Sequence, residues 1–131
     1  MVKNTAAGHK KFWHSFRFAA HGIASAFRSE LNMKVHSCFA VVVLVAAAVF
    51  HLPPSRWMLL LLAITLVLAT ELLNTAIEAT IDLVSPEIHP LAKIAKDTAA
   101  GAVLLTAVFA VITGIYVFYV PVIDWISGFM S

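Results

Sequence analysis

The residues best suited to chemistry are four polar side chains that recur at helical spacing in an apolar part of the chain. Intervals of three, four and four positions place them on one face of a helix: Glu71, Asn74, Glu78 and Asp82. A charged side chain at the centre of a bilayer costs about 2.5 to 3.5 kcal/mol on insertion scales, so such a stripe needs partners, metal or water. We therefore interpret the stripe as a functional site, with polar contacts that only join helices as the alternative.

More polar residues flank the stripe on the segments expected to lie beside it: Glu30, Asn32, Lys34, His36, Lys93, Lys96 and Asp97. Paired carboxylates suit Mg²⁺, which commonly binds one or two carboxylates together with nucleotide phosphates, and lysines can neutralise the remaining phosphate charge. The sequence contains no GxxxxGK[ST] loop and no kinase Gly-rich loop, so side chains would have to hold a nucleotide. Phosphoryl transfer permits this, because it mainly requires alignment, charge stabilisation and a base.

The elements that must position these residues are membrane-spanning helices. The chain has 131 residues, of which 61% are hydrophobic and only 12% charged, and this excludes an ordinary soluble domain. Crossing about 30 Å of hydrocarbon takes about 20 residues. We predict an all-α protein, a single membrane-embedded domain over 1–131, with three spans at 30–52, 55–84 and 91–120.

An amphipathic helix is predicted at 10–28, before the first span. Phe12, Phe16, Ile23 and Phe27 fall on one stripe with cations opposite, which favours a helix in the membrane interface over one packed on another protein helix. Eight of the nine Lys and Arg residues fall on one side of the predicted topology and Arg56 on the other. By the positive-inside rule the first side is cytoplasmic. Arg56 and Asp124 are predicted to be surface charges that flank spans.

The segment from Glu71 to Asp82, with the sequence ELLNTAIEATID, resembles the signature of the prokaryotic diacylglycerol kinase and undecaprenol kinase family. The likeness continues through 85–97 and back to 19–23, and covers the chain from about Phe12 to Gly114. The resemblance implies a homotrimer with composite active sites on the cytoplasmic side of the bacterial inner membrane. It also implies transfer of the γ-phosphate of ATP, bound with Mg²⁺, to the hydroxyl of a membrane lipid.

The resemblance also assigns roles to individual positions. Glu71 matches the general base for the lipid hydroxyl, and Glu30 and Glu78 match the residues that hold the metal ion with ATP. The expected ATP-binding residues are Lys11, Arg17, Glu30, Asn74, Glu78, Glu87, His89, Lys96 and Asp97. The expected lipid-substrate residues are Asn32, Lys34, His36 and Glu71.

The lipid itself is suggested by a short motif on the first span. Glu30, Asn32 and His36 form an ExNxxxH stretch that is similar to the Gram-positive undecaprenol kinase branch. We therefore predict conversion of undecaprenol to undecaprenyl phosphate, with diacylglycerol to phosphatidic acid as the alternative. A small proton or cation carrier is the alternative from another class, and no nucleic-acid partner is expected.

Overall fold

The computed structural model describes residues 5–85 and 89–129, with backbone alone at 5–12 and 129, and all regular structure in these ranges is helical. The helices are α1 (Thr5–Ser29), α2 (Leu31–Val49), α3 (Pro54–Val84) and α4 (Pro90–Phe129). Three of them, α2, α3 and α4, are long and apolar enough to cross a membrane. This confirms the all-α class with three spans and an N-terminal helix.

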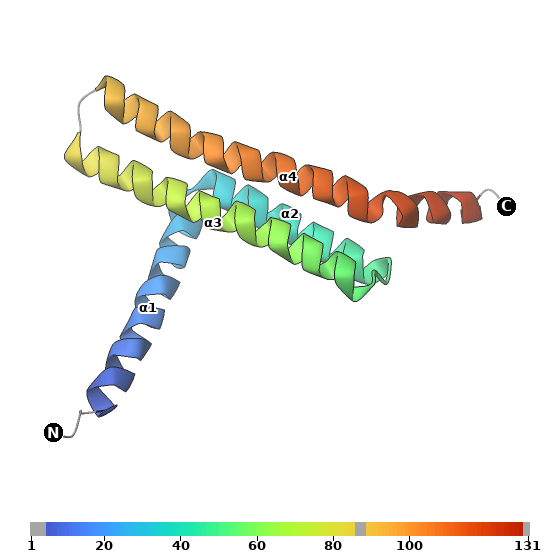
Figure 1. Cartoon of the computed structure of the whole chain (residues 1–131), viewed down its shortest axis with the longest axis horizontal. Helices are drawn as coiled ribbons and strands as arrows, with labels where there is room; N and C mark the ends of the chain where they lie inside the picture. Colours follow the sequence, from blue (N-terminus) through green and yellow to red (C-terminus); the bar gives the residue numbers. More distant parts are fainter. Residues whose placement is uncertain (1–4, 86–88, 130–131) are drawn as a thin grey trace.

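Helix α1 projects away from the other three helices at a steep angle (Figure 1). It begins at Thr5, ahead of the start predicted at residue 10, and ends at Ser29. Trp13, Phe16 and Phe18 are all well exposed along it. Lys34 Nζ on α2 donates to the carbonyl of Arg28 at 3.1 Å, and so binds one of the carbonyls that a helix leaves free at its C-terminus. This contact helps to fix the corner between α1 and α2.

A tight turn joins α2 to α3. Helix α2 ends at Val49, short of the end predicted at residue 52, and His51 adopts a left-handed φ of 50°. The N–H of Leu52 closes the turn on the carbonyl of Ala47 at 3.1 Å. Helix α3 then begins at Pro54, one residue before the start predicted at residue 55, because proline lacks only an N–H that the first turn leaves unpaired anyway.

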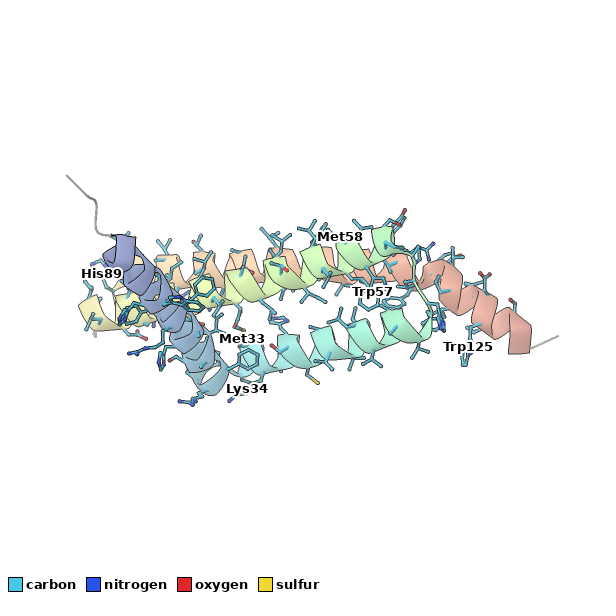
Figure 2. The ribbon with its side chains drawn as sticks, turned by 90° about the horizontal axis from the view of Figure 1, so that it is seen from below. Met33, Lys34, Trp57, Met58, His89 and Trp125 are labelled. Atoms are coloured by element: carbon cyan, nitrogen blue, oxygen red, sulfur yellow. The ribbon has the colours of Figure 1, made fainter. Side chains whose placement is uncertain are left out.

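Helix α3 is central and contacts each of the other helices, most extensively α4. Near the α2–α3 turn the three spans share a buried cluster of Ala47, Leu52, Leu60 and Val117. Further along, the hydroxyls of Thr70 and Thr106 join α3 to α4 at 2.8 Å. Most large apolar side chains point outward (Figure 2), as expected for helices whose solvent is lipid.

Helix α4 has 40 residues, which gives a length of about 60 Å, and it extends beyond the α2–α3 turn (Figure 1). The sequence suggested an end before Pro121, but the helix continues to Phe129. Proline removes one helical hydrogen bond, the bond to the carbonyl four residues earlier. That carbonyl belongs to Val117, and Arg56 Nη1 on α3 donates to it at 3.1 Å. Arg56, predicted to be a surface charge, thus replaces the missing donor.

Candidate active site

Glu71 lies at the centre of the candidate site, on the face of α3 that meets α2. Its side chain is only 1% exposed, and neither carboxylate oxygen has a hydrogen-bond partner within the described residues. The groups that act electrostatically on the carboxyl are those of His36, Glu30 and Glu78, and the Asn32 amide also faces it. Buried polar atoms are normally hydrogen-bonded, so this carboxylate is placed for something other than the stability of the subunit.

Helix α2 supplies the groups opposite Glu71. Asn32 and His36 are one helical turn apart and so share a face of α2. Glu30 occupies the N-cap position of α2, with φ −97° and ψ 124°, but its side chain makes no capping bond. The charge of its carboxylate acts on the Glu71 carboxyl. Lys34, also predicted to contact the lipid, donates to the carbonyl of Arg28 at the end of α1, and its predicted role stays a prediction.

The stripe continues along α3 from Glu71. Asn74 is 7% exposed, and its Nδ2 donates to Glu78 Oε1 at 3.2 Å. The Asn74 Oδ1 atom has no partner among the described residues. The backbone carbonyl of Glu71 accepts from Thr75 Oγ1 at 3.0 Å. This part of α3 therefore presents the Glu78 carboxylate, which is bonded to Asn74, and the Asn74 amide oxygen, which has no partner among the described residues.

Two ion pairs stand near the turn between α3 and α4. Lys96 Nζ on α4 binds Asp82 Oδ1 on α3 at 2.5 Å, and Lys93 pairs with Asp97 within α4. The side chains of Lys96 and Asp82 are 37% and 64% exposed, so water or a ligand can reach them. The structure thus brings the basic end of α4 against the last turn of the acidic stripe on α3.

The structure describes the side chains of two of the remaining predicted ATP-binding residues. Arg17 is exposed on α1, and His89 Nδ1 accepts the backbone N–H of Leu91 at 3.2 Å at the start of α4. Glu87 lies outside the described residues, as does the side chain of Lys11. Their predicted roles stay predictions.

The predicted metal residues, Glu30 and Glu78, both act electrostatically on the Glu71 carboxyl. Across the described part of the chain, no three His, Cys, Asp or Glu side chains gather into a complete protein metal site. Mg²⁺ does not require one, since it typically takes one or two carboxylates and completes its coordination with water and substrate phosphates. The donor set fits Mg²⁺ carried in by a nucleotide.

An apolar groove of about 340 Å³ ends at Val67 and Leu68 on α3, about one helical turn before Glu71. Helices α2 and α4 form its walls and α3 its floor, and small side chains such as Ala63, Ala107 and Gly114 leave the space. His36 lies at the end of the groove nearest Glu71, so the apolar space meets the polar cluster there. Sequence reasoning missed this groove; the small residues on α4 at helical spacing were the available signal.

The arrangement defines a class of protein: a multi-pass membrane enzyme whose polar site at one end of the bundle adjoins an apolar groove. The sequence model of the family described as "Prokaryotic diacylglycerol kinase" matches residues 17–118. The chain belongs to this family, as its resemblance predicted, and it is a lipid kinase that uses ATP.

Two curated relatives show how close the likeness is. The chain is 44% identical to "Undecaprenol kinase" of Bacillus subtilis over 108 residues, which are 82% of this chain and 88% of that protein. It is 48% identical to "Diacylglycerol kinase" of Synechocystis over 101 residues, which are 76% of this chain and 58% of that protein. Similarity therefore extends over most of the chain to relatives whose names specify two different lipids.

Proposed function

We propose that the protein phosphorylates undecaprenol on the cytoplasmic side of the bacterial inner membrane, with Mg²⁺ and ATP. The observation that carries the proposal is the Glu71 carboxylate, which is buried, lacks a hydrogen bond within the described residues and lies about one helical turn beyond the end of an apolar groove. A long-chain alcohol that lies in the groove would bring its hydroxyl to this carboxylate. The positive side of the predicted topology is the side of the polar cluster.

The chemistry assigned to Glu71 is general-base catalysis. Its carboxylate would accept the hydroxyl proton as the lipid oxygen bonds to the γ-phosphorus of ATP, and the bond from that phosphorus to the β,γ-bridging oxygen breaks to release ADP. Asn32 and His36 face the same point from α2 and can hydrogen-bond the lipid hydroxyl or the oxygens of the transferring phosphoryl group. Alignment of the two substrates would be the main contribution of this part of the site.

The nucleotide would lie on the side of Glu71 toward the α3–α4 turn. Glu30 and Glu78 would hold Mg²⁺, which neutralises phosphate charge when bound. Asn74, Lys96 and Asp97 would complete the pocket there, and the predicted contributions of Lys11, Arg17, Glu87 and His89 also belong to this proposal. We further propose a homotrimer, in which a neighbouring subunit supplies groups that one subunit does not bring to Glu71.

Undecaprenol is preferred over diacylglycerol for two reasons. Asn32 and His36, which carry the resemblance to the undecaprenol kinase branch, both face the proposed base. The Bacillus subtilis relative of that name also aligns over a larger share of both chains than the Synechocystis diacylglycerol kinase does. Diacylglycerol remains the second candidate, because that relative is 48% identical.

The test is lipid-dependent release of ADP by purified protein in bilayers that contain either undecaprenol or diacylglycerol. Glu71→Gln keeps the size and hydrogen-bonding capacity of the side chain but removes the base, so we expect a loss of about 10²- to 10⁴-fold. Asp124→Asn is the matched control, since Asp124 is an exposed carboxylate on α4 beyond Pro121 and should not affect the rate. Wild-type activity in Glu71→Gln would refute the assignment, and faster turnover of diacylglycerol would reverse the substrate preference.

A further inference from the structure

The part of α4 that follows Pro121 has no place in the proposed reaction. The family match ends at residue 118, whereas the helix continues to Phe129. We call residues 122–129 the C-terminal foot. The foot is about 12 Å long at the rise of an α-helix, and Figure 1 shows it extending past the α2–α3 turn.

The distribution of apolar side chains changes at Pro121. Before it, α4 is apolar on nearly all sides, as a spanning helix must be. After it, Val122, Trp125 and Ile126 recur at helical spacing on one face, and Asp124 and Ser127 occupy the opposite face. An apolar stripe opposite a polar stripe is typical of a helix at a boundary between water and lipid.

The position of the foot relative to the membrane follows from contacts one turn earlier. Val117 belongs to the buried cluster at the α2–α3 turn, and its carbonyl accepts from Arg56 at the start of α3. Residues beyond Pro121 therefore lie further out than the turn, where α2 and α3 leave the hydrocarbon. Trp57 lies near the turn and Trp125 further along α4 (Figure 2), as expected of aromatic residues near a membrane surface.

We propose that the C-terminal foot binds the phospholipid boundary of the leaflet at the α2–α3 turn, with its apolar face against the acyl chains. Trp125 and Ile126 are 59% and 44% exposed, so the subunit itself leaves this face open to lipid. Helix α4 changes direction near its C-terminal end (Figure 1), as a proline inside a helix allows, and Arg56 binds the Val117 carbonyl that the proline leaves without its helical donor. The foot thus anchors the end of α4 on the leaflet opposite the active site.

The charge of the foot identifies the kind of lipid contact. Residues 122–131 contain Asp124 and no Lys or Arg. Attraction to anionic headgroups is therefore absent, and burial of apolar side chains is the driving force. Binding should require no anionic lipid and should not weaken at high salt. In this respect the foot differs from α1, whose cations are suited to binding anionic headgroups.

Spin labels along the foot can test the proposal in vesicles of zwitterionic phosphatidylcholine. In a Cys38→Ser background, which is otherwise free of cysteine, single cysteines replace Val122, Asp124, Ile126 and Ser127 in turn. Labels at the two apolar positions should be relaxed mainly by oxygen, which concentrates in lipid, and labels at the two polar positions mainly by a water-soluble nickel complex. Retained lipid kinase activity of each labelled protein would show that it is folded.

Two results would overturn the proposal. Nickel access at all four positions would place the foot in water, and restricted access to both reagents at Val122 and Ile126 would place that face against protein. The pattern should persist at high salt if apolar burial holds the foot. The measurement reads position and not turnover, so its outcome is independent of which lipid the enzyme phosphorylates.

Discussion

Replacement of Arg56 by methionine should destabilise the protein through one backbone carbonyl. Pro121 has no N–H, so the carbonyl of Val117 lacks its helical donor, and Arg56 Nη1 supplies another at 3.1 Å. The Val117 residue is fully buried, with 0% exposure. Methionine keeps much of the apolar stem of arginine and removes the donor, so the variant isolates the hydrogen bond.

The size of the effect follows from the cost of an unsatisfied buried acceptor, about 1 to 3 kcal/mol. Arg56 is half-buried, and part of its bond strength is offset by side-chain entropy, so we expect a loss of about 1.5 kcal/mol. In a Pro121→Ala background the alanine N–H can bind the Val117 carbonyl, and the same substitution should cost less than about 0.5 kcal/mol. The coupling energy between Arg56 and Pro121 is then about 1 kcal/mol.

The assay is reversible unfolding of the purified protein in mixed micelles by increasing SDS, for wild type, both single variants and the double variant. Lys93→Met is the control, because Lys93 is a cation in an exposed pair with Asp97, worth about 0.2 to 1 kcal/mol at most. Equal losses for Arg56→Met in the wild-type and Pro121→Ala backgrounds would refute the reasoning. In that case Arg56 would stabilise the helix ends by a route independent of the proline.

Three further outcomes are expected. Glu78→Gln should raise the Mg²⁺ concentration required for half-maximal ADP release by several-fold or more, because one of the two proposed carboxylate ligands loses its charge. An unchanged Mg²⁺ dependence would show that Glu78 does not bind the metal. Asp82→Asn should weaken ATP binding, because Lys96, a proposed nucleotide contact, loses the partner that positions it. It should change the free energy of unfolding by less than about 1 kcal/mol, since the pair with Lys96 is exposed; a large stability loss with unchanged KM for ATP would indicate a purely structural pair. Thr70→Val should lower the free energy of unfolding by about 0.6 kcal/mol and leave turnover unchanged, because the hydrogen bond from Thr70 to Thr106 joins two helices inside the membrane. SDS unfolding measures the stability, and the ADP-release assay measures the turnover.

Much of the fold could be predicted because the bilayer permits few solutions. Apolar length sets the number of spans, and helices satisfy their own backbone groups in lipid, so three helices followed from composition and spacing. The helix ends were less accurate where proline was involved. Pro121 was interpreted as a stop, yet a contact from Arg56, 61 positions away from Val117 along the chain, satisfies the carbonyl that proline leaves free. Local patterns do not contain such a long-range partner.

The candidate site, too, could be predicted where it depends on local spacing and not where it depends on contacts between helices. The spacing from Glu71 to Asp82 predicted one polar stripe on one helix, and the structure joins part of that stripe through Asn74 and Glu78. Which residues of α2 act on it was not deducible from α3 alone: His36 acts electrostatically on the Glu71 carboxyl, whereas Lys34 binds a carbonyl at the end of α1. The groove was not predicted either, because it forms only when three helices pack and small residues from each of them, such as Ala40, Ala63 and Ala107, line the same space.

The open side of the groove has a consequence for kinetics. Helices α2 and α4 both pack on α3 and, among the described residues, have no extensive contact with each other. If the groove binds the lipid as proposed, the hydrocarbon chain would enter sideways from the bilayer, and arrival at the site would be a two-dimensional diffusion process. The rate would then depend on the mole fraction of the lipid in the membrane, so adding inert phospholipid should slow the reaction at constant bulk concentration. For such an enzyme the bilayer acts as the reaction medium and as the store from which substrate is drawn.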